Sequence, residues 1–417
     1  MSAKTVKITA RKIIVDSKTI LDDATVIIKK GAVAKIGPAE TLSQIKTDRV
    51  INLKNHILHP GFVNAHCHLD LSFLKGKLKQ GAPFTSWIRS LVAKRVKATM
   101  QEIDNGIKNG IKQLISTGTT SVGDISSTGR SPSILAHSGM RAILFHETLG
   151  YNPPDAISRF NDLKQILEKF ADSDLLKSGV SPHAIYSVSP ALFKKVSAYA
   201  KKNNLPVAIH MAETEEEIEF SKKGTGPFRE LLISFGSFAP GRYPKTSPVG
   251  AVANFNGLKN SILIHANHIS NADIAKIKKA HATIVICPNS NRWFKRPISA
   301  PVGTLLDNGV PLALGTDSLA SNYALDMTAE IREFHKKFPD ISLHQLFDMA
   351  TNGGALALGL KGGTGTLAVK APFDAVAIKM PKNIKTDPIK AIITSRRKIA
   401  MVWINGTAKY KNMENMK

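Results

Sequence analysis

The sequence predicts an α/β protein in which a (β/α)8 TIM barrel carries a small β-sandwich domain formed from both chain ends. Short apolar runs alternate with amphipathic helical stretches through the middle of the chain, and strand-like segments with tight turns fill both ends. A length of 417 residues suits a barrel of about 250 residues with a smaller companion. The expected division is residues 1–58 and 361–417 for the β-sandwich domain and residues 59–360 for the barrel.

The chain ends contain the short strands of the smaller domain. Strands are expected at residues 6–10, 24–28, 32–36, 375–378 and 400–404. Lys30-Gly31 and Asn405-Gly406 supply turns beside them. Because two β-rich ends flank one α/β middle, we expect the ends to combine into a single domain.

The middle of the chain contains eight short apolar runs, each expected to be a buried parallel strand. They lie at residues 62–63, 119–122, 141–145, 179–181, 206–209, 261–264, 283–286 and 311–314. Helical patterns separate them, for example the apolar spacing from Ile88 to Leu114. Active groups of such barrels lie at the C-terminal strand ends, so polar residues just after each run are the candidates for a site.

The composition restricts the partners of this protein. The net charge is +25, from 57 Lys and Arg against 32 Asp and Glu. Most lysines stand singly along expected helix faces, without an aromatic-rich basic loop, so we expect no nucleic-acid partner. The positive charge would instead steer an anionic small-molecule substrate. The sequence is also compatible with a homodimer.

Cysteine content and hydropathy indicate the cellular setting. The two cysteines, Cys67 and Cys287, exclude a disulfide scaffold and a four-cysteine zinc site, and we expect both to be small buried residues. No apolar run approaches the roughly 18 residues of a membrane span, and the N-terminus shows no secretory signal core. We therefore expect a cytoplasmic protein without a membrane partner.

His66 and His68 are the most informative pair in the chain. They follow the apolar run Phe62-Val63, and residues i and i+2 of a strand point to the same face. Both imidazoles can therefore reach one metal while Cys67 turns away. Solvated and structural histidines also show this spacing, so the metal interpretation depends on three further segments.

Those segments also follow predicted strands. One run leads into His210, with Glu213 three residues later, another leads into His265, and the last is followed by Asp317. A parallel barrel would gather these ends around one mouth. Imidazoles and a carboxylate suit one divalent metal, with Zn²⁺ preferred over Fe²⁺. His183 follows the fourth strand, where no lysine is present to bridge a second metal.

Together these motifs resemble the amidohydrolase superfamily, in the subgroup of metal-dependent deaminases and hydrolases that act on nitrogen heterocycles. The resemblance covers almost the whole chain and rests on residues 60–68, 181–184, 210–213, 265 and 315–322. It implies one metal, proton transfer by Glu213 and a place over the reacting centre for His265. The implied metal ligands are His66, His68, His210 and Asp317.

The implied roles agree with the chemistry of the side chains. A bound divalent metal lowers the pKa of water from 15.7 to about 7, so that metal hydroxide can attack a ring carbon. Asp317 would take a proton from that water, Glu213 would protonate a ring nitrogen and the leaving amine, and His265 would stabilise the tetrahedral centre. The alternatives are a surface position for Glu213, near the acidic residues 215–217, and core packing for His265.

Other side chains are candidates for substrate contacts. Glu147 would hold ribose hydroxyls, with a solvated strand-end carboxylate as the alternative, and His183 would bind a ribose or carboxylate unless it caps its strand. Trp87 would cover the mouth of the barrel unless it belongs to the core. Ser72 completes this set, and His268 is expected to pack behind the site.

Within the subgroup, residues 68–72, 146–150, 181–189 and 287–291 most resemble the aminofutalosine deaminase branch of menaquinone biosynthesis. The resemblance implies a hydrolytic deaminase of an aminated purine nucleoside, aminofutalosine, that releases ammonia. The alternatives are a methylthioadenosine or S-adenosylhomocysteine deaminase and a triazine-type chlorohydrolase. A catalytically inactive scaffold protein is an alternative from a different class, against which the intact metal set and Glu213 argue.

Overall fold

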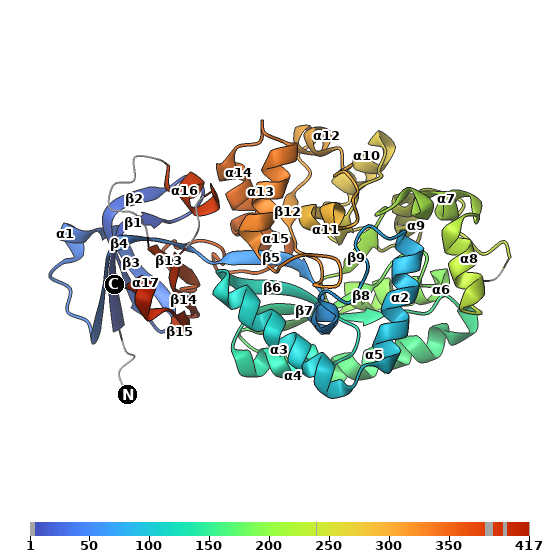
Figure 1. The fold of residues 1–417 in the computed structure, drawn as a ribbon, viewed down its shortest axis with the longest axis horizontal. Coiled ribbons are helices and arrows are strands. Elements are labelled where there is room, and N and C mark those ends of the chain that lie inside the picture. The colour runs from blue at the N-terminus through green and yellow to red at the C-terminus, as the bar shows by residue number, and fades with distance from the viewer. Residues whose placement is uncertain (1–4, 239, 380–386, 395–397, 417) are drawn as a thin grey trace.

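The computed structural model describes residues 5–238, 240–379, 387–394 and 398–416. Two parts of the molecule lie side by side (Figure 1). One is a sheet in which a block of C-terminal strands lies beside a block of N-terminal strands, and the other is a larger body of strands and surrounding helices.

Both chain ends contribute to one seven-stranded sheet of described residues, in the order β15-β14-β13-β4-β1-β2-β3. Its strands are β1 (Thr5–Ile14), β2 (Ile20–Lys29), β3 (Ala32–Pro38), β4 (Arg49–Pro60), β13 (Ala375–Lys379), β14 (Lys398–Ile404) and β15 (Thr407–Lys411). β13 pairs antiparallel with β4, and this pairing joins the two ends of the chain. The five strands expected here are confirmed, whereas β4 and β15 were not predicted. The two-layered sandwich arrangement and the domain boundaries stay predictions.

The larger body contains two four-stranded parallel sheets within the described chain, β5-β6-β7-β8 and β12-β11-β10-β9. Their strands are β5 (Phe62–Cys67), β6 (Thr119–Ser126), β7 (Arg141–Thr148), β8 (Leu176–Pro182), β9 (Ala208–Met211), β10 (Ile262–His265), β11 (Thr283–Ile286) and β12 (Leu312–Leu314). All eight overlap the predicted runs. Nearly every residue in them is buried, as expected of parallel strands that are covered on both faces.

The two parallel sheets meet along both of their outer edges. A parallel bridge pairs Val180 of β8 with Val207, just before β9. At the other edge, the backbone N–H groups of Thr316 and Asp317 donate to the carbonyl oxygen of His66 at 3.0 and 3.1 Å. The ends of β5 and β12 are thereby held together, and this contact brings two of the expected metal ligands close to each other.

Helices follow most strands of the larger body. Those of the chain are α1 (Ala39–Leu42), η1 (Leu69–Leu74), α2 (Phe84–Lys97), α3 (Met100–Ser116), α4 (Ser131–Ser138), η2 (Pro153–Asp155), α5 (Ala156–Lys169), α6 (Pro190–Lys202), α7 (Glu215–Lys223), α8 (Pro227–Ser234), α9 (Pro248–Asn254), α10 (Asn271–Lys279), α11 (Pro288–Trp293), α12 (Val302–Asp307), α13 (Met327–Lys337), α14 (Leu343–Met349), α15 (Asn352–Ala357), α16 (Pro388–Thr394) and α17 (Met413–Met416). The helical pattern expected between Ile88 and Leu114 forms two helices, because Thr99 caps a new one with Glu102.

A buried ion pair connects the terminal sheet to the larger body. Arg141, the first residue of β7, donates to both carboxylate oxygens of Asp374 at 2.7 and 3.3 Å. Asp374 also accepts the backbone N–H of Asn405 at 2.6 Å, in the turn between β14 and β15. This one carboxylate therefore fixes strands from both parts of the molecule.

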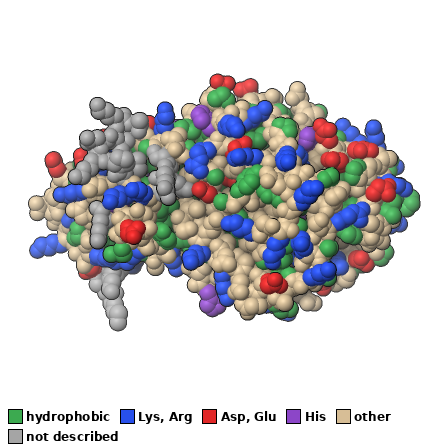
Figure 2. Space-filling view, in the orientation of Figure 1, with side chains coloured by type: hydrophobic (Ala, Val, Ile, Leu, Met, Phe, Trp, Pro, Cys, Tyr) green, Lys and Arg blue, Asp and Glu red, His purple; other side chains and the backbone are tan. Residues whose placement is uncertain are grey.

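The surface is basic without a single concentrated patch on the face shown in Figure 2, where Lys and Arg side chains are spread over both parts. This distribution agrees with the interpretation of the lysines as separate positions on helix faces. Among the described helices, none is both long and apolar enough to span a membrane.

Candidate metal centre and active site

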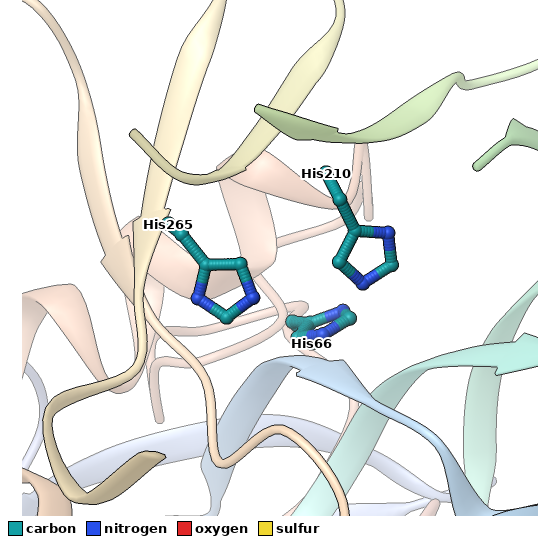
Figure 3. Close-up of side chains that lie close together, drawn as sticks. All are labelled: His66, His210 and His265. Carbon is teal, nitrogen blue, oxygen red and sulfur yellow. The ribbon is translucent and has the colours of Figure 1, made fainter. Parts of the chain in front are cut away.

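The ends of four strands bring the predicted metal residues together. His66 lies at the end of β5, His210 in β9 and His265 at the end of β10, and their rings turn toward a common centre (Figure 3). One ligand atom from each of these three histidines lies within 4.8 Å of the others, and the same holds for His66, His68 and Asp317. All five side chains are buried. Strand ends far apart in the sequence thus form one cluster.

Asp317 presents one carboxylate oxygen to this cluster. Its Oδ1 lies 3.6 Å from Nε2 of His66 and 3.9 Å from Nε2 of His68. The hydroxyls of Ser290 and Ser321 donate to Oδ2 at 2.8 and 2.7 Å. The backbone of Asp317 has a φ of 58°, a conformation that residues other than glycine rarely adopt and that is often found at functional sites. Oδ1 is therefore the oxygen that can bind a metal.

The donor atoms fit a divalent metal. Nε2 of His66 is buried without a hydrogen-bond partner in the described chain, and Nε2 of His68 lies 3.2 Å from Nε2 of His210. Burial lowers the pKa of both His68 and His210 well below the usual value, so their imidazoles are neutral and have lone pairs available. Burial raises the pKa of Asp317, but the interactions with His66 and with the nearby His265 and His68 outweigh it and the pKa falls, which favours the carboxylate. Three imidazoles and one carboxylate are a set that Zn²⁺ or Fe²⁺ binds.

Glu213 and His265 lie together at the edge of the cluster. Oε2 of Glu213 is 3.6 Å from Nε2 of His265, and Oε1 accepts a hydrogen bond from Arg296 at 2.8 Å. Glu213 is 3% exposed and lines the same cavity as His265, so the surface position considered for Glu213 is not observed. His265 likewise faces the cavity and the other histidines, which differs from a position in the apolar core.

Glu217 holds the backbone that carries Glu213. Its carboxylate accepts the backbone N–H groups of Ala212 at 3.0 Å and of Glu213 at 2.8 Å. Burial raises the pKa of Glu217 to about 8, although these two hydrogen bonds act in the opposite direction. The acidic residues 215–217 are therefore not one solvated face, because the third of them points into the protein.

A cavity of about 710 Å³ opens beside the cluster. Glu147, His183 and Trp87 line it as expected. Glu147 Oε1 is buried without a hydrogen-bond partner among the described residues, 4.0 Å from Nε2 of His183. Burial raises the pKa of Glu147 to about 8 and lowers that of His183 to about 4, so both groups are neutral near pH 7. Trp87 stacks on Phe84 with 5.6 Å between ring centroids.

Two other expected residues lie outside this cavity. Ser72 is buried against α3, where a Cβ on Gly110 would lie 2.7 Å from its hydroxyl oxygen, and it does not line the cavity. The 3-10 helix η1 that follows His68 turns Ser72 away from the strand ends. His268 lies 3.9 Å from Glu215, away from the cavity lining. Cys67 and Cys287 are fully buried, as expected of small apolar residues.

Two residues near the cluster were not found from the sequence. Arg296 contacts Glu213 across 83 residues of chain, and no local pattern marks it. Tyr186 lines the cavity and is 5% exposed, with its ring 4.1 Å from that of Phe228. Tyr186 stands three residues after His183, so its nearness in sequence to a candidate residue was an available signal.

Most of the chain is similar in sequence to proteins that are named as deaminases. The aminodeoxyfutalosine deaminase of Nitratiruptor sp. is 28% identical, with 94% of this chain and 96% of that protein covered. A 5′-deoxyadenosine deaminase of Methanococcus aeolicus is 31% identical, with 87% and 85% covered. A 5-methylthioadenosine/S-adenosylhomocysteine deaminase of Syntrophobacter fumaroxidans is 27% identical, with 87% and 81% covered.

Solved structures share the fold. Aminofutalosine deaminase of Helicobacter pylori, in complex with methylthio-coformycin, superimposes with a TM-score of 0.85 at 23% identity, covering 96% of this chain and 99% of that one. An adenosine deaminase from Xanthomonas campestris with bound zinc gives 0.83 at 22% identity, covering 97% and 92%. The sequence profile of the amidohydrolase family matches residues 57–409. This chain therefore belongs to the amidohydrolase family.

Proposed function

We propose that this protein is a metal-dependent hydrolytic deaminase of an aminated purine nucleoside, with aminofutalosine as the preferred substrate. The observation that carries the proposal is the pairing of Glu213 with His265 at the edge of the histidine and aspartate cluster, inside one cavity. An acid–base carboxylate beside a metal-binding set is what addition of water to an electron-poor ring carbon requires. The deaminase relatives support the same class of reaction.

The residues of the site divide the chemistry among them. His66, His68, His210 and Asp317 would hold one divalent metal, Zn²⁺ in our proposal, which lowers the pKa of a bound water from 15.7 to about 7. Asp317 is placed to accept a proton from the attacking water. Glu213 would deliver a proton to a ring nitrogen and then to the leaving amine, and His265 would donate to the oxygen at the tetrahedral carbon.

The nonreacting part of the substrate would occupy the outer cavity. Glu147 and His183 would contact the ribose, because both line the cavity 4.0 Å apart. A neutral Glu147 can donate a hydrogen bond to one ribose hydroxyl and accept one from another. Exposed apolar side chains, among them Val92, Leu149 and Phe235, line this cavity together with charged ones such as Arg95 and Arg159. The apolar side chains would contact an extension at the 5′ position, such as the aromatic extension of aminofutalosine or the thioether of methylthioadenosine, the second candidate.

The proposed site requires the two parallel sheets to form one closed barrel. The bridge between Val180 and Val207 and the hydrogen bonds to the carbonyl oxygen of His66 support closure at both edges. Closure would place all four metal ligands at the C-terminal mouth, where such barrels hold their active sites. With aminofutalosine as substrate, the enzyme would serve menaquinone biosynthesis.

The absorbance change from adenine to hypoxanthine tests the proposal. Turnover should be highest with aminofutalosine when it is compared with methylthioadenosine, S-adenosylhomocysteine and adenosine. Glu213→Gln should retain the metal and the fold but lose at least about 100-fold in kcat, because it cannot transfer a proton. No ammonia release from any of these nucleosides would refute the deaminase. A tenfold preference for methylthioadenosine would support the deaminase activity but refute aminofutalosine as the preferred substrate.

A further inference from the structure

Arg296 has an unusual environment beside the proposed acid–base residue. It lies in the loop after α11, and its Nη2 atom donates to Oε1 of Glu213 at 2.8 Å. The guanidinium carbon lies 4.4 Å from the ring centroid of Phe294 and 5.3 Å from that of Phe84. Two aromatic faces therefore hold the planar group in a fixed orientation, which a cation–π contact favours.

Two further nitrogen atoms of the Arg296 guanidinium make no hydrogen bond to any described residue. Nε and Nη1 are buried and have no hydrogen-bond partner among the residues that the structure describes. A guanidinium has five N–H donors, and leaving buried donors unpaired costs free energy. An arginine kept for stability alone would be expected to spread its donors over several acceptors. Here the single described acceptor is the carboxylate of Glu213.

The contact makes the two oxygens of Glu213 unequal. Oε1 is engaged by Arg296, whereas Oε2 faces His265 at 3.6 Å. The backbone of Glu213 is fixed separately by Glu217, so the guanidinium acts on the side-chain orientation. We infer that Arg296 is a positioning residue, which fixes the Glu213 carboxylate through Oε1 and reserves Oε2 for proton transfer. This inference rests on the proposed role of Glu213 as the proton carrier.

Lysine would be a poor substitute at this position. An ammonium group retains the charge but lacks the planar guanidinium that lies over the rings of Phe294 and Phe84. Arg292, four residues earlier, is the matched control. It is exposed, lies 3.3 Å from Glu333 and has no contact with Glu213.

The test compares Arg296→Ala, Arg296→Lys and Arg292→Ala in the metal-loaded enzyme. Arg296→Ala should lower kcat about 10- to 100-fold, since a misplaced catalytic group loses rate of this order, with KM changed less than about threefold. Arg296→Lys should lie between Arg296→Ala and the wild type, and Arg292→Ala should match the wild type. Added methylguanidine should restore part of the kcat of Arg296→Ala.

The Glu213→Gln background separates positioning from a structural role. There, Arg296→Ala should cause no further loss of kcat, because the proton carrier is already absent. Normal kcat in Arg296→Ala, or an equal loss in both backgrounds, would overturn the inference. If Arg296→Ala does not fold, the same comparison of kcat is made with Arg296→Lys in the wild-type and Glu213→Gln backgrounds. A wild-type enzyme without deaminase activity would refute the proposed function. If the wild type is active and Glu213→Gln is inactive, a normal kcat in Arg296→Ala would refute this inference alone.

Discussion

The carboxylate of Glu217 accepts the backbone N–H of Glu213 at 2.8 Å, so one buried acid holds the main chain of another. Glu217→Ala would leave this N–H and that of Ala212 buried and unpaired. We expect the free energy of unfolding to fall by about 1–3 kcal/mol and kcat to fall because Glu213 moves. Urea unfolding and turnover measure the two effects. Glu215→Ala is the control, since that side chain is 87% exposed and should change the stability by less than about 0.5 kcal/mol.

Metal content should depend on four side chains. Elemental analysis of the wild type should find about one Zn²⁺ or Fe²⁺ per chain, because one site uses all the proposed ligands. Alanine variants of His66, His68, His210 and Asp317 should each bind less metal and lose activity together with it. His137→Ala, an exposed histidine of α4, should retain the metal. Two metals per chain would contradict a mononuclear site.

His146 should make stability decrease in acid. The residue is 2% exposed, and burial lowers its pKa to about 4. As pH falls below about 6.5, the unfolded chain binds a proton that the folded protein does not, so stability is lost between pH 6.5 and pH 4. The contribution is about 2 kcal/mol between pH 7 and pH 5. Urea unfolding at both pH values should show a smaller difference for His146→Asn than for the wild type or the exposed control His281→Asn.

Asp374→Ala should destabilise the protein strongly. The variant leaves Arg141, whose side chain is 9% exposed, as a buried unpaired charge, which costs about 3–5 kcal/mol. The control is Asp104→Ala, which breaks a similar pair with Arg130, but there the side chains are 18% and 40% exposed. Asp104→Ala should destabilise the protein much less than Asp374→Ala, because solvent screens an exposed ion pair. Equal losses of stability in the two variants would show that burial of the Arg141 pair is unimportant.

The sequence alone was sufficient to predict strands wherever buried residues form a continuous apolar run. All eight strands of the larger body were found because parallel strands covered on both faces are continuous apolar runs. Strand β4 was missed because residues 52–56 of it are mostly polar and resemble a loop. The clustering of the three candidate histidine ligands and Asp317 could be predicted because each follows such a run directly, and a parallel fold gathers those positions; their role as metal ligands stays a prediction.

The contacts that refine the site depend on tertiary packing. Glu217 resembles a solvated residue in a run of three glutamates, yet it shares the inner face of α7 with Phe220 and Ser221. That spacing of three and four residues was a usable signal. The position of Ser72 outside the cavity could not be predicted, because the sequence does not reveal that a 3-10 helix follows His68. Arg296 could not be found, since only the folded chain brings it to Glu213.

The pairing of the two chain ends within one sheet has a consequence for synthesis. β4 is made early, but its partner β13 begins at Ala375, after the whole larger body. During translation the strands β1 to β4 can form a partial sheet whose β4 edge stays unpaired until most of the chain has left the ribosome. An open edge of this kind can pair with another nascent chain, and chaperone binding there would favour correct assembly. The terminal sheet is thus completed only late in the synthesis of each chain.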